Sequence, residues 1–132
     1  MLGFSVRTTR RGPLFNGMAR RAADDFADAW EEEMAEYALD HIRRTYHTPF
    51  RHPTGYYESH VRITNASLGP KVWDGGLSGP KYGPWLEGLG SRNATTRFKG
   101  YHAFRNAARA VQVRAERMGE RLLHRRYLRR MN

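Results

Sequence analysis

The sequence predicts an α+β domain in which two long amphipathic helices pack on a small antiparallel sheet. Two helical apolar stripes, one early and one late in the 132-residue chain, predict the helices, and an alternating stretch between them predicts the sheet. This length suits one domain with a single modest core. We therefore divide the chain into an N-terminal arm, residues 1–17, and one α+β domain, residues 18–132.

The N-terminal arm has neither a helical nor a strand period, and it contains Gly12-Pro13, a turn signal. We interpret it as an extended arm or edge strand followed by a turn. Segments of this kind are often ordered only by a neighbouring molecule.

From Met18 to about Tyr46 the apolar residues recur at helical spacing and predict a long helix. Its apolar stripe consists of Phe26, Trp30, Tyr37, Ile42 and Tyr46. Eight of the thirteen acidic residues lie between Asp24 and Asp40 without a basic residue among them, so the other face is acidic. Pro49 then prevents the helix from continuing.

The segment from Tyr56 to Thr64 alternates apolar and polar residues and predicts a half-buried strand. A second strand is expected from Lys71 to Asp74, after a Gly69-Pro70 turn, so that the two form an antiparallel hairpin. Residues 75–80 are expected to form a loop.

Two short features precede the last helix. Tyr82 to Glu87 predicts a single helical turn, which Gly88 and Gly90 end. The segment from Ser91 to Gly100 has no apolar period, and we interpret it as a basic loop that presents its side chains outward.

The last helix has the clearest period. Its apolar stripe consists of Phe104, Ala107, Ala108, Val111, Ala115, Met118 and Leu122. Its outer face is mostly arginine, namely Arg105, Arg109, Arg114, Arg117 and Arg121. Because burial of a large apolar side chain contributes about 1.5 to 3 kcal/mol, the two helical stripes should form most of the core.

The formal net charge is +10, which favours polyanions or acidic protein surfaces as partners. No apolar run approaches the length of a membrane span or a signal peptide, so we expect a soluble protein made inside a cell, without a membrane partner. There are no cysteines, which excludes disulfides and thiolate metal sites.

The polar residues match no catalytic or metal-binding pattern. The histidines His41, His47, His52 and His60 have no zinc-site spacing, and the glycines form no phosphate-binding motif. The acidic residues of the first helix point around it rather than to one point. We therefore expect no catalytic residue, no metal and no cofactor.

Opposite charge on two helices suggests assembly. A head-to-tail contact needs two complementary patches on one subunit and closes into a ring if the rotation permits. The acidic and basic helix faces are such patches, although they could equally pair within one subunit. The arginine-rich helix could also contact nucleic acid.

One block of sequence resembles a known family. The block comprises Tyr82–Gly88, Gly90–Asn93 and Thr95–Tyr101. It is similar to the neck or tail-component proteins of long-tailed, siphovirus-type bacteriophages that infect actinobacteria. Three further segments resemble that family in order and spacing, namely Gly12–Phe15, Thr54–Tyr57 and Val72–Asp74.

The resemblance implies a structural virion protein, without catalytic residues, that forms a homo-oligomeric ring in the neck, with six subunits favoured over twelve. The ring would stand at the head-tail junction, between a head-closure (adaptor) protein and the tail terminator or tail tube protein. Viral DNA would pass through its channel without sequence-specific recognition, and assembly would take place in the host bacterial cytoplasm.

Within this interpretation the N-terminal arm and the basic loop contact other subunits or rings. The loop residues are Arg92, Asn93, Thr95, Thr96, Arg97, Phe98 and Lys99, and the residues that anchor the loop are Tyr82, Trp85 and Leu86.

Two alternatives belong to other classes. A free-standing basic nucleic-acid-binding protein would lose affinity for duplex DNA steeply with salt. A small hydrolase or nuclease would depend on single residues such as His60 or Glu58.

Overall fold

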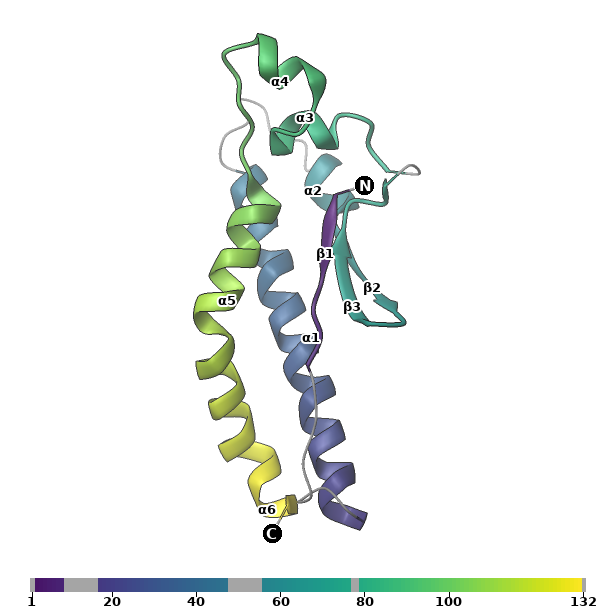
Figure 1. Ribbon diagram of the computed structural model, residues 1–132, viewed down its shortest axis with the longest axis vertical. Helices are drawn as coiled ribbons and strands as arrows, with labels where there is room; N and C mark the ends of the chain where they lie inside the picture. The colour runs from purple at the N-terminus through teal and green to yellow at the C-terminus, as the bar shows by residue number, and fades with distance from the viewer. Residues whose placement is uncertain (1, 9–16, 48–55, 77–78, 132) are drawn as a thin grey trace.

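A computed structural model describes residues 2–8, 17–47, 56–76 and 79–131. It confirms the α+β class: two long helices, α1 (Gly17–His47) and α5 (Ala103–Leu122), lie side by side and pack on a small three-stranded sheet (Figure 1). The strands are β1 (Gly3–Ser5), β2 (Arg62–Ala66) and β3 (Gly69–Trp73). The other helices are α2 (Tyr56–His60), α3 (Gly83–Glu87), α4 (Ser91–Thr95) and α6 (Leu128–Met131).

The sheet has the order β1-β3-β2, and both pairings are antiparallel. The predicted hairpin is confirmed, with Ile63 of β2 opposite Val72 of β3. The predicted position of its turn is wrong, because Gly69 and Pro70 pair with β2 as the first residues of β3 and the turn lies at Ser67-Leu68. The arm supplies the remaining edge strand, which confirms the edge-strand interpretation for residues 3–5. Leu2 and Val6 on either side of β1 are buried in this chain's own core, while the predicted Gly12-Pro13 turn lies outside the described residues.

A buried carboxylate fixes the arm to α1. Glu31 lies on α1, and its Oε1 accepts hydrogen bonds from the backbone N–H of Thr8 at 2.5 Å and from the Thr8 hydroxyl at 2.9 Å. Glu31 is buried. It is therefore a positioning residue of the fold, although the sequence places it within the acidic run.

The prediction of one strand from Tyr56 to Thr64 is wrong in its first half, which forms the helix α2. A helical turn brings Tyr57 and Val61, four residues apart, into the core together. Arg43 of α1 supports the end of this turn, because its Nη2 donates to the carbonyl oxygen of Val61 at 3.0 Å and its Nε donates to that of Glu58 at 3.4 Å. A contact with a distant helix thus decides the local conformation.

The core lies between α1, α5 and the sheet. Ile42, Tyr46, Val61 and Val72 have the largest fully buried side chains. Between the first half of α1 and the second half of α5, the Trp30 Nε1 donates to the carbonyl oxygen of Ala115 at 2.8 Å. Most of the stripe predicted for α5 therefore meets Ile42 and Tyr46 of α1 in one core. Trp30 and Tyr37 of the stripe predicted for α1 are only partly buried at its margin, and Phe26 stacks on Trp30.

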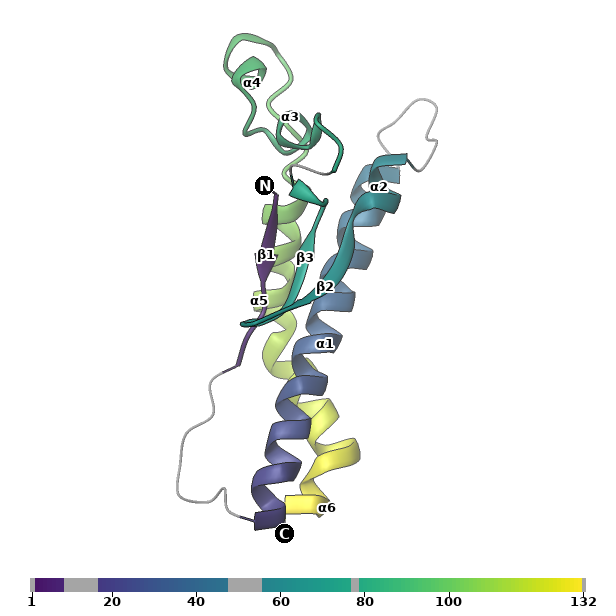
Figure 2. The ribbon, with the colours of Figure 1, turned by 90° about the vertical axis from the view of Figure 1, so that its right-hand side faces the viewer.

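The last helix changes its hydrogen bonding after Leu122, where a π-helical turn (Leu123–Tyr127) leads into α6. A π turn holds one residue more than an α turn, which rotates the following residues back by roughly 100°. Tyr127 therefore packs on Phe26 of α1, with ring centroids 5.9 Å apart, and Arg130 forms an ion pair with Asp25 at 2.7 Å. The C-terminal end of the chain thus lies beside the start of α1 (Figure 2).

Candidate assembly interface

All ten residues predicted to form the assembly site lie in one part of the fold, residues 82–101, which we call the distal lobe. It contains α3 and α4 and projects beyond one end of the helix pair, opposite the C-terminal end of the chain (Figures 1 and 2). The structure thus brings the predicted loop residues and their predicted anchors into one small unit.

The predicted single helical turn is confirmed as α3. It ends at Gly88, whose φ of 100° is left-handed and whose N–H donates to the carbonyl oxygen of Pro84 at 3.0 Å. Gly100 is also left-handed, and a Cβ there would lie 2.3 Å from the Cα of Gly88. Two glycines therefore let the chain that leaves the lobe pass against the end of α3.

The prediction that Ser91 to Gly100 forms a loop is wrong for its first half, which forms α4. Asn93 does not face outward, because its side chain is buried. Its Oδ1 accepts the N–H of Gly90 at 2.9 Å, and its Nδ2 donates to the carbonyl oxygens of Trp85 and Phe98 at 3.0 and 3.1 Å. Asn93 thus ties three segments of the lobe together.

The anchors divide into two groups. Leu86 is buried, whereas Trp85 packs on Phe98 with ring centroids 4.5 Å apart but remains 38% exposed. Tyr82 lies instead against α2, with its ring centroid 5.6 Å from that of Tyr57. It joins the base of the lobe to the rest of the domain.

The outward side chains of the lobe are of two kinds: Tyr82, Trp85 and Leu89 are exposed apolar or aromatic residues, and most of the others are basic or hydroxylic. Arg92, Thr95, Thr96, Arg97 and Lys99 are all exposed. Lys99 is used within the lobe, since its Nζ donates to the carbonyl oxygen of Asn93 at 2.8 Å. Among the described residues no carboxylate forms an ion pair with Arg92 or Arg97, so these two guanidinium groups are available to a partner.

A buried polar cluster lies where the lobe joins the helices. The Tyr57 hydroxyl donates to Oδ2 of Asp74 at 3.1 Å, and the other Asp74 oxygen accepts the N–H of Gly76 at 3.0 Å. Glu87 is buried and accepts the N–H of Phe104 and that of Arg105, both at 3.0 Å. It therefore caps the N-terminal end of α5.

Only part of this cluster has a signal in the sequence. Asp74 is followed by Gly75-Gly76, and this Asp-Gly-Gly pattern is a turn signal that could have suggested its role. Glu87 has no local signal, because its partners lie 17 and 18 residues further along the chain.

Burial changes the pKa of Tyr57 and of the neighbouring Tyr46. Burial raises the pKa of Tyr57 well above its usual value of 10.0, and the neighbouring Tyr46 and Asp74 raise it further. Burial likewise raises the pKa of Tyr46, followed by the charges of Glu87 and Asp74. Both hydroxyls therefore stay protonated in the folded chain at a pH at which an unfolded tyrosine ionises.

This difference predicts alkaline instability that depends on Tyr57. The folded chain keeps a proton that the unfolded chain releases, so the stabilisation is complete below pH 10 and is lost as the pH rises above it. At pH 8 we expect Tyr57→Phe to be less stable by about 1 to 2 kcal/mol, because Asp74 loses a donor. Urea unfolding at pH 8 and pH 11 should show this gap shrinking by about 1 kcal/mol or more. An unchanged gap would contradict the assignment.

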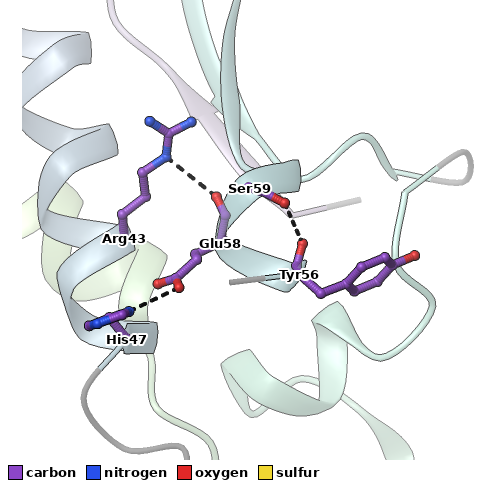
Figure 3. Close-up of polar contacts among 5 residues, drawn as sticks. All are labelled: Arg43, His47, Tyr56, Glu58 and Ser59. Atoms are coloured by element: carbon purple, nitrogen blue, oxygen red, sulfur yellow. Dashed lines mark hydrogen bonds and ion pairs between the residues drawn. The ribbon is translucent and has the colours of Figure 1, made fainter. Parts of the chain in front are cut away.

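The polar residues at the end of α1 support the fold (Figure 3). The Oε1 of Glu58 on α2 lies 3.1 Å from the Nδ1 of His47, and the hydroxyl of Ser59 donates to the carbonyl oxygen of Tyr56 at 2.8 Å. The His60 Nδ1 lies 2.6 Å from that same carbonyl oxygen. Glu58 and His60, the residues named for the hydrolase alternative, thus engage different partners.

Metal binding is the other role that the histidines could have. Within the described part of the chain, no group of three or more histidine, aspartate or glutamate side chains is placed to hold a metal ion. His52 lies outside the described residues.

The acidic and basic helix faces lie partly beside each other in the same chain. They line a groove of about 400 Å³ between α1 and α5. Its acidic side consists of Glu33, Glu36 and Asp40, and its basic side of Arg114, Arg117 and Arg121. The Arg114 guanidinium also lies over the ring of Tyr37, 5.4 Å from its centroid. The sequence left open whether the acidic and basic faces pair between subunits or within one subunit. In the structure, these two rows face one another within one subunit.

Comparison with known proteins gave no match to a protein-family model, to a curated protein or to a solved structure. Among the described helices, none combines the length and apolar character that a membrane crossing requires.

Proposed function

We propose that this chain is a structural ring subunit in the neck of a long-tailed bacteriophage, joining the head connector to the tail while DNA passes through. The observation that supports this most is the distal lobe, since the sequence block that resembles phage neck proteins coincides with it. Ten residues selected from sequence for assembly lie together in this projecting unit.

The lobe has the properties of a contact surface. Its own polar groups are largely satisfied by internal bonds, above all through Asn93, so its shape does not depend on a partner. Arg92 and Arg97 remain exposed, and between Gly88 and Ala115 the sequence contains no acidic residue. Arginine is well suited to carboxylates at protein interfaces, because its guanidinium group can donate two parallel hydrogen bonds.

These features suit the partners that the sequence resemblance implies. The lobe would contact an acidic surface of the head-closure or adaptor ring on one side, or of the tail terminator or tail tube protein on the other. Six copies of the chain would form the ring. The chain's role would be structural, without catalytic residues or cofactor.

We predict that Arg92→Ala combined with Arg97→Ala strongly reduces the joining of heads to tails. Both side chains are exposed and form no ion pair among the described residues, so the free energy of unfolding should change by less than about 0.5 kcal/mol. The measurement is complementation of a phage deleted for this gene, with joined particles counted by electron microscopy.

Arg62→Ala combined with Arg109→Ala is the matched control. It removes the same charge from exposed positions on β2 and α5, outside both the distal lobe and the C-terminal end of the chain. The lobe variant should fail while this control joins heads to tails normally. Normal joining by the lobe variant would show that the lobe is not the contact.

The position of the chain is tested independently by cryo-electron microscopy of virions. Ring-shaped density for this chain at the head-tail junction is expected, and it would give the number of subunits directly. Absence of the chain from purified virions would overturn the proposed function.

A free-standing nucleic-acid-binding protein is the second candidate, and the C-terminal end of the structure favours it. Arg125, Arg126 and Arg129 are exposed there, and the exposed Arg20 and Arg21 belong to the start of α1, which α6 contacts. Each phosphate that such arginines neutralise adds a salt-dependent increment of affinity.

For this candidate we predict that Arg125→Ala, Arg126→Ala and Arg129→Ala together lower both the affinity for duplex DNA and its salt dependence. The slope of log affinity against log salt should fall by up to about 0.9 for each phosphate that the variant no longer neutralises. Fluorescence anisotropy with a labelled duplex measures both quantities. If the purified wild-type chain binds duplex DNA negligibly at low salt, this candidate is wrong.

A further inference from the structure

The outward face of α5 carries one straight stripe of exposed residues. They are Arg105, Arg109, Val113, Glu116 and Glu120. Their spacing of four, four, three and four residues places them on one line along a helix. Figure 1 shows α5 forming one long edge of the molecule, on the side away from β2 and β3.

The centre of this stripe is an apolar side chain left in solvent. Val113 is 83% exposed, although it lies on a long helix whose opposite face forms the core. Among the described residues, none of the four charged side chains of the stripe forms an ion pair. The stripe is therefore an unpartnered surface with two basic residues before the valine and two acidic residues after it.

The order of charges makes the stripe complementary to itself. Arg109 and Glu116 lie four and three residues from Val113, and Arg105 and Glu120 lie eight and seven residues from it. An antiparallel copy centred on Val113 therefore places Arg105 opposite Glu120 and Arg109 opposite Glu116. A parallel copy would instead place arginine on arginine and glutamate on glutamate.

We propose that α5 is the contact surface of a symmetric dimer, in which a second copy of this chain binds antiparallel across a two-fold axis near Val113. Both kinds of arginine-glutamate pair are formed twice by symmetry, as an isologous contact requires. The two valines meet at the centre and exclude water from each other. The partner is fixed by charge complementarity, because a uniformly acidic or basic surface would be repelled by one half of the stripe.

This contact goes beyond the proposed ring and does not depend on it. A ring between head and tail has all its subunits pointing the same way, whereas an antiparallel pair has its members pointing in opposite directions. The dimer is therefore a state of the free chain. An interface of one helix face is small, so the association is weak and sensitive to salt.

Disulfide trapping tests the pairing at its centre, because the chain has no cysteine of its own. In Val113→Cys the two thiols of an antiparallel pair face each other. We expect this variant to form a disulfide-linked dimer at least tenfold faster at low salt than Leu89→Cys, a control on the distal lobe that is 71% exposed. The excess should disappear in high salt. Equal rates for the two variants at low salt would overturn the proposal.

A second set of variants tests the register. Arg105→Cys and Glu120→Cys should each remain mostly unlinked alone, but link to each other when mixed. Rapid linking of Arg105→Cys to itself would indicate parallel pairing and contradict the proposal.

Charge reversal provides a final control within the Val113→Cys chain. Adding Glu116→Lys and Glu120→Lys makes the stripe uniformly basic and should remove the rate excess. Adding Arg105→Glu and Arg109→Glu as well restores opposite charges in the same register and should restore the fast rate. Fast linking of the uniformly basic variant would show that the stripe does not pair through its charges. A negative result in any of these experiments leaves the position of the chain in virions to be decided separately.

Discussion

Replacing Glu87 with alanine is expected to lower the free energy of unfolding by about 2 to 4 kcal/mol. The buried carboxylate accepts two backbone N–H groups at the start of α5, each at 3.0 Å. A hydrogen bond to a charged group contributes about 1.5 to 3 kcal/mol, and a buried donor left without a partner is costly. Urea unfolding followed by circular dichroism measures the loss.

Two variants sharpen this prediction. Glu87→Gln keeps an acceptor oxygen and most of the volume, so its loss should be clearly smaller than that of Glu87→Ala. Glu116→Ala removes an exposed carboxylate from the same helix and should change the stability by less than about 0.5 kcal/mol. A loss below about 0.5 kcal/mol for Glu87→Ala would show that the cap does not stabilise α5.

The second large effect is expected at Gly119, where alanine should destabilise the domain by about 1 to 3 kcal/mol. A Cβ at this position would lie 2.7 Å from the ring of Trp30, far inside van der Waals contact. The ring cannot simply move away, because its Nε1 is bonded to the carbonyl oxygen of Ala115. At an exposed helix position the same substitution would instead stabilise by up to about 1 kcal/mol.

The expected change from destabilisation to stabilisation by Gly119→Ala can be tested in a chain that lacks the Trp30 ring. With Trp30→Leu the obstacle is gone, and Gly119→Ala should then be neutral or stabilising. Urea unfolding of the four chains gives the coupling between the two positions. If Gly119→Ala stabilises the wild-type chain, the close packing of Trp30 on α5 is wrong.

The long helices and the hairpin could be predicted from the order of residues alone. The 3.6-residue period persists for several turns in both helices, so many residues contribute to the same prediction. Gly69-Pro70 and the β-type residues on both sides of it indicated the hairpin in the same local way, although these two residues lie in β3 and not in the turn itself. The ten predicted interface residues also fall in one lobe, because they lie within twenty consecutive positions.

The shorter elements and the buried polar residues depend instead on tertiary contacts. Five residues from Tyr56 form a helix because Arg43, thirteen positions earlier, satisfies carbonyl groups at its end. Asn93 is a buried link rather than an outward contact because its partners lie on both sides of α4. The short segments contain too few residues to show a period.

The arrangement of the charges likewise depends partly on the sequence and partly on the tertiary structure. The sequence placed acidic residues on one helix and basic residues on the other, but only the packing of α1 on α5 brought parts of the two rows to opposite sides of one groove. The spacing of Arg105, Arg109 and Val113 along α5 is set by the sequence, but the packing of α1 on α5 left this row outside the groove. Composition determines which charges are present, whereas their distances depend on how the helices pack, and an electrostatic contact depends on distance.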